Sequence, residues 1–280
     1  MTTNSSTKSL VSEICAENNI TCTAHSKGYI LRLTKNGQVR HLYGNYWDLN
    51  SAAADHIACD KCGCYILLQA GSVPAIEHTL VFNPLERGEW AGNEGTLASA
   101  LTYFEKHNRK LVVKPNKGTQ GQHVYYCDTA LSLERALAEI FATQPDAALS
   151  PYVEIGTEYR VFYLAGRAHF MYGKKPVDSW KHNLAAGAAA VELNDPALEE
   201  RLSYIALRAA QCIGITFASI DIAEDKNGDL LVMEINAGVM ANRLLEQHPH
   251  LRPTIKGLFA EAVERLFSQK RIAGTVGLQV

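Results

Sequence analysis

The sequence predicts an α+β protein, and three observations lead to this. Apolar residues recur with a helical period in some segments and alternate with polar residues in others. Asn-Gly and Ala-Gly pairs join several alternating segments, as expected for antiparallel hairpins. The helices and hairpins do not follow one another as regular β-α-β units, which favours α+β lobes over a doubly wound parallel sheet.

The N-terminal elements follow from these patterns. Residues 10–19 have the apolar spacing of a short helix. Residues 29–33 and Gln38–Tyr43 alternate on either side of an Asn-Gly pair, which predicts a hairpin. A helix start at residues 50–64 runs into a second helix, Lys61–Ala70, which a glycine ends.

The remaining elements are predicted in the same way, and residues 84–96, with three glycines and a proline, are expected to form a loop. In chain order they are an extended piece at 79–83, a helix at 97–107, strands at 110–114 and 123–127, a helix at 132–143, strands at 149–153, 159–164 and 169–173, a helix at 195–213, strands at 217–223 and 230–236, and a helix at 250–266.

Composition narrows the functional class. The 280 residues carry a formal net charge of −2, so no basic excess indicates binding to nucleic acid or to a membrane surface. No apolar run approaches the length of a membrane span, and the polar N-terminus has no secretory h-region. The seven cysteines are scattered and odd in number, which fits a reducing cytoplasm better than a disulfide framework.

The first candidate site is the segment from Lys114 to Gly121, which lies between two predicted strands. Gly118 and Gly121 permit a tight turn whose backbone N–H groups face one point, an arrangement that suits phosphate oxygens. Lys114 ends an apolar strand, where its ammonium would reach into a cleft. A hairpin loop with a solvated lysine pair is the alternative. The segment is not a Walker A loop, because no Gly-Lys-Ser/Thr and no helix follow.

The second candidate site combines Asp221 with Glu234 and Asn236. These residues lie on two predicted strands joined by a turn, and Glu234 and Asn236 are two residues apart, so they share a face. Carboxylates in such apolar strands need a cation or a partner. Oxygen ligands of this kind suit Mg²⁺, while an ion pair with Arg or Lys is the alternative.

The third candidate site is the strand–loop–strand segment at 151–160. Its extended backbone can pair with an adenine edge, and a carboxylate such as Glu158 can accept hydrogen bonds from ribose hydroxyls. The alternative is that Arg160 is only a cross-strand partner of Glu158.

Other residues carry weaker signals. Cys59, Cys62 and Cys64 have no second Cys/His pair at zinc-site spacing, so they are interpreted as ordinary thiols. The pair His248 and His250 is interpreted as structural or solvated. Two methionines, at 233 and 240, are interpreted as core packing.

Taken together and in this order, the three segments resemble the ATP-grasp superfamily, above all the RimK-type carboxylate–amine ligases, with cyanophycin synthetase and glutathione synthetases nearby. The resemblance covers about 57–246. Asp60-Lys61 opening a helix that ends at Gly71-Ser72-Val73-Pro74 looks like a further family feature, as does the Asn-Leu-x-x-Gly segment within 180–187. Departures are Pro151 at the hinge, where Glu or Gln is usual, and the lysine and histidine that precede Asn183, where an arginine is usual.

The resemblance implies a role for each candidate residue. The ATP phosphates would be contacted by Lys61, Lys114 and the loop residues Lys117, Gly118, Thr119, Gln120 and Gly121. Adenine would be bound by the backbone of Tyr152 and Val153, and ribose by Glu158. One or two Mg²⁺ or Mn²⁺ ions would be held by Asp221, Glu234 and Asn236. The residues expected near the γ-phosphate or the acyl phosphate are Arg160, Lys175 and Asn183. Arg243 lies where related ligases bind substrate.

The fold implied is ATP-grasp, with two α+β lobes that clasp ATP. Residues 56–150 form the first lobe with the glycine loop, residues 151–275 form the second lobe with the metal-binding strands, and residues 1–55 form a short hairpin-plus-helix segment. The activity implied is cytoplasmic ATP-dependent ligation of a carboxylate to an amine through an acyl phosphate, on amino acids or small peptides, by a homodimer. A small-molecule kinase and a non-catalytic ATP-binding module are the alternatives.

Overall fold

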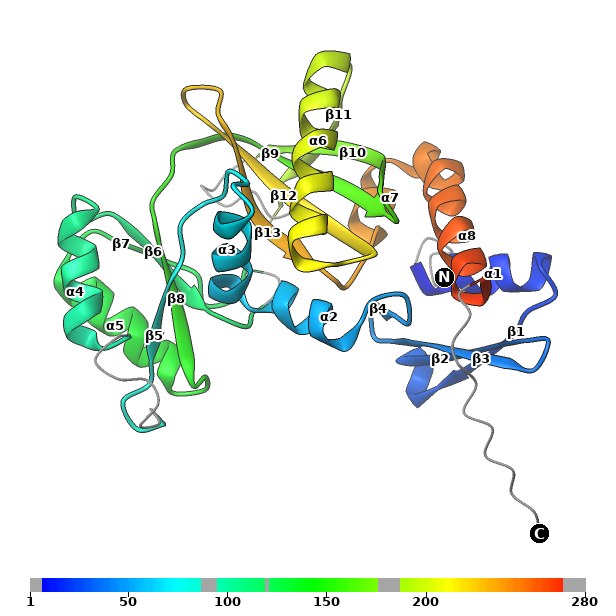
Figure 1. Ribbon diagram of the computed structural model, residues 1–280, viewed down its shortest axis with the longest axis horizontal. Helices are drawn as coiled ribbons and strands as arrows, with labels where there is room; N and C mark the ends of the chain where they lie inside the picture. The colour runs from blue at the N-terminus through cyan, green and yellow to red at the C-terminus, as the bar shows by residue number, and fades with distance from the viewer. Residues whose placement is uncertain (1–6, 87–94, 119–120, 176–186, 269–280) are drawn as a thin grey trace, which may run out of the picture.

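The computed structural model describes residues 7–86, 95–118, 121–175 and 187–268. Three antiparallel sheets lie in a row, with helices packed on their faces (Figure 1). The helices are α1 (Thr7–Glu17), α2 (Ala52–Cys59), α3 (Lys61–Ala70), α4 (Leu97–Lys106), α5 (Ala130–Phe141), α6 (Pro196–Ile213), α7 (Asn242–Gln247) and α8 (Arg252–Ser268), with 3-10 turns η1 (Ser26–Gly28) and η4 (Pro249–Leu251). The strands are β1 (Thr21–His25), β2 (Ile30–Lys35), β3 (Gln38–Tyr43), β4 (Tyr46–Trp47), β5 (Thr79–Phe82), β6 (Leu111–Pro115), β7 (Tyr125–Cys127), β8 (Asp146–Pro151), β9 (Ile155–Leu164), β10 (Arg167–Lys175), β11 (Ala189–Glu192), β12 (Phe217–Asp225) and β13 (Leu230–Asn236).

The N-terminal sheet has the order β1-β2-β3-β4 and packs with α1 against α8. Its central hairpin turns at Asn36 and Gly37, both at positive φ, which confirms the hairpin expected from the Asn-Gly pair. Trp47 of β4 stacks on Phe259 of α8 and meets Phe217 of β12 edge to face. The N-terminal segment therefore shares its core with α8 and with the central sheet.

The second sheet, β5-β8-β6-β7, is covered by α4 and α5 and has its own apolar core. The helix α5 begins with a capping box in which Thr129 and Ser132 satisfy each other's backbone N–H groups. Leu133, Leu137 and Ile140 of α5 pack onto the sheet, as their spacing predicts.

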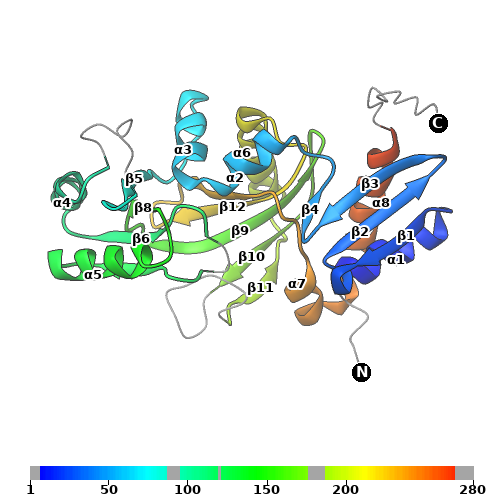
Figure 2. The same cartoon turned by 90° about the horizontal axis from the view of Figure 1, so that it is seen from below.

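The central sheet, β11-β10-β9-β12-β13, has two different faces. Figure 2 shows α2, α3 and α6 on one side of it, where Val161, Ile220 and other alternate residues form an apolar core. On the opposite face one end is apolar, with Phe162 and Phe217 packed toward α8. The other end of that face carries Arg160 and Asp221. This alternation along β9 and β12 places charged side chains at one end of a well-packed sheet.

The expected α+β class is confirmed, and each predicted helix has an observed counterpart within a few residues of its range, whereas helix α7 was not expected. Three strands, β1, β4 and β11, were not expected either. β1 is mostly exposed, so it lacks the buried–exposed alternation by which a strand is recognised. The N-terminal segment is accordingly a helix with a four-stranded sheet, rather than a hairpin plus a helix.

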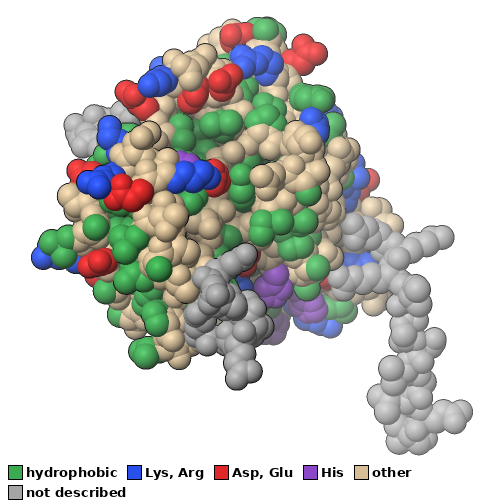
Figure 3. Space-filling view, turned by 60° about the vertical axis from the view of Figure 1, so that its left-hand side comes forward, with side chains coloured by type: hydrophobic (Ala, Val, Ile, Leu, Met, Phe, Trp, Pro, Cys, Tyr) green, Lys and Arg blue, Asp and Glu red, His purple; other side chains and the backbone are tan. Residues whose placement is uncertain are grey.

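The part of the chain that the structure describes contains no long apolar helix. On the face that Figure 3 shows, side chains of both charge signs lie interspersed with apolar ones. Among the described residues, no helix has the length and hydropathy that a bilayer crossing requires.

Asn50 joins the N-terminal segment to the central sheet, so its substitution by Ala should destabilise the fold. Its side chain accepts from the N–H groups of Thr216 and Phe217 and donates to Asp55 and to the Phe217 carbonyl. We expect Asn50→Ala to lower the free energy of unfolding by about 2 kcal/mol in urea titrations, because backbone groups lose partners. Asn194→Ala, at an exposed position with no side-chain bond to the described residues, is the matched control. Equal midpoints for the two variants would contradict this role.

Candidate active site

A cleft of about 870 Å³ lies between the second sheet and the central sheet. β6 and the connection after β8 line one side, and β9, β12 and β13 line the other, with the N-terminus of α3 and the turn from β3 into β4 also contributing. This volume is in the range of pockets that hold a nucleotide-sized ligand. Most of the described candidate residues line this one cleft.

The N-terminus of α3 is tied to the glycine segment. Asp60 caps α3 by accepting from Gly63 N at 2.8 Å and also accepts from the Asn116 amide at 3.0 Å. The Asn116 side chain in turn accepts from Cys62 N at 3.1 Å. Lys61 Nζ donates to the Gly118 carbonyl at 2.9 Å. Helix α3 and the first half of the loop are thus held as one unit.

Two glycines of this loop are required by its geometry. A Cβ at Gly118 would lie 3.1 Å from Pro115 Cβ, so a side chain there would need the Pro115 ring to shift by a few tenths of an ångström. Gly121 has a φ of +68°, the left-handed conformation that favours glycine. Thr119 and Gln120, predicted to contact phosphate, lie outside the described residues. Lys117 is exposed, with its Nζ 3.9 Å from Asp60 Oδ2.

Lys114 lines the cleft, and its ammonium has no direct partner among the described residues. It faces the cleft from β6, and its ammonium makes no hydrogen bond or ion pair with the described residues. Burial lowers the pKa of Lys114 to about 8; Glu234 opposes this shift and Lys61 adds to it. An under-neutralised ammonium of this kind is suited to receive an anion.

The central sheet arranges the other charged residues in rows across its strands. Asp221 of β12 is paired in register with Arg160 of β9 on one side and with Glu234 of β13 on the other. In the neighbouring row, Glu158 of β9 lies opposite Lys174 of β10. Residues that are far apart in sequence are thereby brought to one face by strand register alone.

Asp221 is held by three donors. Arg160 donates to both of its oxygens, at 2.7 and 2.6 Å, and Lys174 Nζ lies 3.1 Å from Oδ1. The Asn236 amide donates to Oδ2 at 3.2 Å. Lys174 also pairs with Glu158. The alternative interpretation of Asp221, as an ion-pair partner, is therefore what the structure shows.

These contacts set the ionisation of the cluster. Burial opposes the charged form of Asp221, but Arg160 and Lys174 outweigh it and hold the pKa of Asp221 at about 2. Burial raises the pKa of Glu158 to about 7, since Asp221 adds to the effect and Lys174 only partly offsets it. Burial also opposes the charged form of Lys174, yet the two carboxylates hold its pKa above the ordinary value.

The oxygen donors needed for a divalent cation are present. The Glu234 carboxylate lines the cleft and forms no hydrogen bond or ion pair with the described residues. Asn236 uses its amide nitrogen toward Asp221, which leaves its carbonyl oxygen for another partner. Carboxylate and amide oxygens fit Mg²⁺ or Mn²⁺. Asp221 could join them only if Arg160 or Lys174 changed partner.

A β-bulge re-aims β13 at this point. The register shifts between Asp221 and Ile222, because Ile222 pairs with Val232 and Met233 is the extra residue. Met233 and Glu234 consequently both line the cleft. Met233, interpreted from the sequence as core packing, instead lines the cleft, and strict alternation could not have revealed this.

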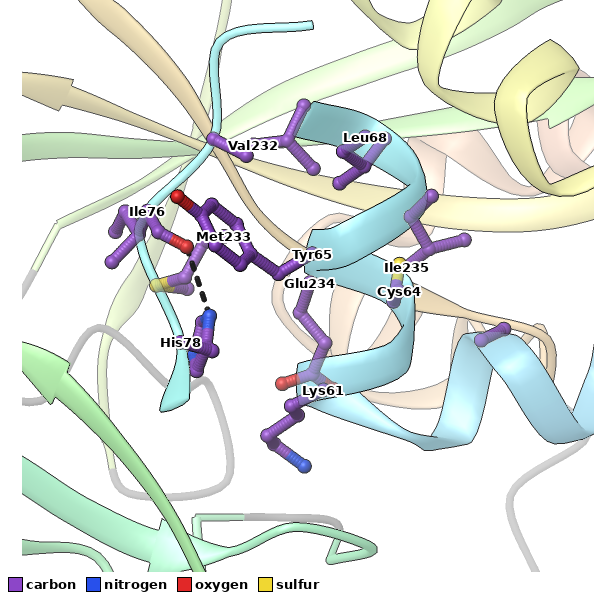
Figure 4. A pocket seen from close by; sticks show the side chains of 12 residues that line it. Lys61, Cys64, Tyr65, Leu68, Ile76, His78, Val232, Met233, Glu234 and Ile235 are labelled. Atoms are coloured by element: carbon purple, nitrogen blue, oxygen red, sulfur yellow. Dashed lines mark hydrogen bonds between the residues drawn. The ribbon is translucent and has the colours of Figure 1, made fainter. Parts of the chain in front are cut away.

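Figure 4 shows the junction of α3, β13 and the segment before β5. Lys61 and Glu234 line the same small pocket there. His78 bonds the Ile76 carbonyl through Nδ1 at 2.9 Å, and its buried Nε2 has no partner among the described residues. Burial and the nearby Lys114 lower the pKa of His78 well below its usual value, so the ring is neutral. Sequence patterns gave no signal for this residue.

The connection after β8 crosses the rear of the cleft. Tyr152 N donates to the Lys110 carbonyl, whereas the N–H and carbonyl of Val153 form no hydrogen bond with the described residues. Val112, two residues before Lys114, pairs with Ser150 and so lies beside this connection. An unpaired backbone edge next to an apolar side chain is suited to a flat heterocycle.

A family model described as the RimK-like ATP-grasp domain matches residues 96–248, more than half of the chain. The chain belongs to the RimK-like ATP-grasp family.

Relatives within this family match only part of the chain. A probable alpha-L-glutamate ligase of Pseudomonas savastanoi pv. phaseolicola is 33% identical over 131 residues, which cover 45% of this chain and 42% of that protein. The alpha-aminoadipate–LysW ligase LysX of Saccharolobus solfataricus is 29% identical over 143 residues, covering 49% of this chain and 51% of that protein. The chain thus matches about half or less of the length of these relatives.

Solved structures agree on the ATP-grasp fold. The D-alanine–D-alanine ligase of Bacillus anthracis in complex with ATP superposes with a TM-score of 0.60 at 18% identity, covering 78% of this chain and 69% of that one. The ATP-grasp ligase PsnB in complex with a minimal precursor superposes with a TM-score of 0.55 at 17% identity, covering 78% and 64%. The expected ATP-grasp fold is therefore confirmed.

The RimK-like fold brings most, but not all, of the predicted residues to the cleft. Lys175 is exposed, and it lies on the opposite side of β10 from Lys174, so the lysine at the cleft is Lys174. The alternation along β10 was the available signal, since Tyr172 and Lys174 share a face. Arg243 lines the open end and bonds Glu246 at 2.8 Å. Asn183 lies outside the described residues.

Cys59, Cys62 and Cys64 are free cysteines in the structure. Cys62 and Cys64 are buried, and burial raises the pKa of each to about 12. Cys59 contacts the Tyr46 hydroxyl at 3.2 Å. Within the described ranges the three do not belong to a group that could hold a metal ion.

Paired lysine variants test the placement of Lys174. We expect Lys174→Met to lower the free energy of unfolding by about 3 kcal/mol at about pH 8, because Glu158 loses its counter-ion in a buried position. Glu158 has a raised pKa in the folded state, so its proton restores stability as the pH falls below about 7. The loss should therefore shrink at about pH 5. Lys175→Met is the control and should change stability little, and equal losses for both variants would refute the assignment.

Proposed function

We propose that this protein is an ATP-dependent carboxylate–amine ligase that acts through an acyl phosphate on amino acids or small peptides. The proposal rests on the cleft of an ATP-grasp fold, where a group of buried or half-buried cationic side chains meets a group of carboxylates. The cations are Lys61, Lys114, Arg160 and Lys174, and the carboxylates are Glu158, Asp221 and Glu234. Such a set can bind a polyphosphate and a divalent cation together.

ATP binding would use both sides of the cleft. The adenine would lie against Val153 and Met233, where the unpaired backbone of Val153 offers a donor and an acceptor. Lys114 would contact the phosphates, and Lys61 would support them through the loop carbonyls that it already holds. Lys117 and the loop from Gly118 to Gly121 would close over the phosphates.

Phosphate binding would change partners within the ion-pair cluster. Phosphate oxygens would attract Arg160 and Lys174, which now neutralise Asp221. Lys174 would thereby leave Glu158, whose carboxylate could then accept hydrogen bonds from the ribose hydroxyls. Asp221, Glu234 and Asn236 would be left to hold one or two Mg²⁺ or Mn²⁺ ions, which neutralise charge on the transferred phosphoryl group.

The chemistry proposed has two steps. A substrate carboxylate oxygen attacks the γ-phosphorus, the bond to the β-γ bridging oxygen breaks, and ADP and an acyl phosphate result. An amine then attacks the acyl carbon, phosphate leaves with the C–O bonding electrons, and the amine loses a proton. Arg160 and Lys174 would stabilise the charge on the phosphoryl oxygens. Arg243, at the open end, would bind a substrate carboxylate.

The relatives guide the choice of substrate. Proteins named as glutamate and alpha-aminoadipate ligases each match a little under half of the chain, so acidic amino acids are the first substrates to test. This chemistry requires neither a membrane nor a nucleic acid. A cytoplasmic location would supply ATP. That the protein is a homodimer remains a prediction.

Proton uptake tests the role of Lys114. Its pKa in the free protein is about 8, and phosphate contact would raise it, so Mg-ATP binding between about pH 8 and 10 should take up protons and weaken with rising pH. The neighbouring Glu158 and Cys62 titrate near 7 and 12, outside this window. Calorimetry in buffers of different ionisation enthalpy measures the uptake. Lys114→Arg stays charged, so it should bind ATP without proton uptake, and uptake in both proteins would contradict the assignment.

Trapping the acyl phosphate tests the activity. Incubation with Mg-ATP, amino-acid pools beginning with glutamate, and hydroxylamine should yield ADP together with a hydroxamate. Glu234→Gln should lower the rate roughly 10²-fold, because a metal ligand is lost, while Glu199→Gln on the surface of α6 should not. ADP with a stable phosphate ester would instead indicate a kinase. Tight ATP binding without either product would indicate a binding module.

A further inference from the structure

We propose that Glu192, His248 and His250 form a second metal site, one that takes a transition-metal ion of the Zn²⁺ class. These residues come from the end of β11 and from the segment between α7 and α8. One ligand atom from each lies within 4.8 Å of the others. None of the three lines the nucleotide cleft, so the inference does not depend on the proposed ligase activity.

The distances are those of a nearly assembled coordination site. His248 Nδ1 lies 3.6 Å from Glu192 Oε1, and His250 Nε2 lies 2.8 Å from the same oxygen. Two ligand atoms of a tetrahedral zinc ion, each about 2.0–2.1 Å from the metal, are about 3.4 Å apart. The first distance already fits, and the second needs to open by about half an ångström.

The tautomer of His248 leaves a lone pair aimed at the carboxylate. His248 Nε2 lies 3.0 Å from the Ala190 carbonyl, which can only accept, so Nε2 carries the proton. When Nδ1 carries no proton, its lone pair lies 3.6 Å from a carboxylate oxygen, which is also an acceptor. A metal ion between these two atoms would satisfy both, as a proton would. A histidine that donates its other N–H to a backbone carbonyl is the usual arrangement around a metal.

The backbone around the site is held in place before any metal arrives. Gln247, next to His248, accepts from Ala190 N at 2.8 Å and donates to the Ala188 carbonyl at 3.1 Å. The side chains of Gln247 and His248 therefore fix the end of α7 to the edge of β11. Preorganised ligands reduce the ordering that metal binding requires.

The ligand set distinguishes this site from the oxygen site in the cleft. Two imidazole nitrogens and one carboxylate suit Zn²⁺, Co²⁺, Ni²⁺ or Cu²⁺, whereas Mg²⁺ prefers oxygen ligands only. Glu192 and His250 are largely exposed, which leaves a fourth position for water. An ion bound here would cross-link β11 and the C-terminal end of α7. The first turn of the same helix, from Asn242 to Leu244, lines the cleft.

Cobalt spectroscopy on the full chain tests the proposal. Chelator-treated protein without nucleotide is titrated with Co²⁺, and a tetrahedral or five-coordinate N/O site gives a visible d–d band far stronger than that of an octahedral oxygen site. We expect one Co²⁺ per chain, displaced by Zn²⁺ and not by Mg²⁺. An intense near-ultraviolet thiolate band, or no band at all, would overturn the assignment.

Two conservative variants separate ligation from structure. His250→Gln can still donate to Glu192, and His248→Gln can still donate to the Ala190 carbonyl, but neither amide replaces an imidazole as a ligand. Each should weaken Co²⁺ binding at least about tenfold while the thermal midpoint of the metal-free protein changes little. His56→Ala and Glu234→Gln, outside the site, should leave the band unchanged. Unchanged affinity in both glutamine variants would mean that the three residues form only a hydrogen-bonded cluster.

Discussion

The pairing of Arg160 with Asp221 is the interaction on which the rest of the site depends. Both residues face the cleft end of the central sheet, and the Asp221 side chain is almost fully buried. A buried carboxylate is costly unless it is neutralised and hydrogen-bonded, and the bidentate guanidinium does both. Lys174 and Glu158 extend the same network into the next row of the sheet. The protein can therefore keep its reactive residues in an apolar sheet before any ligand binds.

The same network explains why ligands would bind in concert. Asp221 has no unoccupied oxygen for a metal while Arg160 and Lys174 remain in place. In the proposed complex, phosphates would offer those two cations better partners, and their departure would expose the oxygen atoms of Asp221, Glu234 and Asn236. Nucleotide and metal would thus each remove an obstacle to the other, which is a coupling between neighbouring sites. Lys114, with its lowered pKa and no direct partner among the described residues, would supply the first attraction for the phosphates.

Sequence patterns revealed much of this arrangement. The two-residue spacing of Glu234 and Asn236, and the turn that returns Asp221 to them, predicted a shared face that the register confirms. The Asn-Gly hairpin and the amphipathic helices were likewise readable, because local turn chemistry and periodicity determine them. The metal-binding role of the acidic residues remains a proposal.

Other features depend on register or tertiary contacts that no local pattern encodes. The bulge at Met233 turns this residue into the cleft, and β1 is an exposed edge strand without an apolar face. Lys174 was missed in favour of its neighbour Lys175 because the residue that faces Glu158 is fixed by pairing between β9 and β10. The grouping of His248 with Glu192 required the fold to bring residues 56 positions apart together.

In the proposed mechanism, Arg160 and Lys174 occupy the place of the metal until phosphates draw them away. Mn²⁺ binding without nucleotide, followed by electron paramagnetic resonance in the wild type and in Arg160→Gln, tests this exchange. We expect weak binding in the wild type and an affinity at least about tenfold higher in the variant, because one competing cation is gone. Equal affinity, or weaker binding in a variant that remains folded, would contradict it.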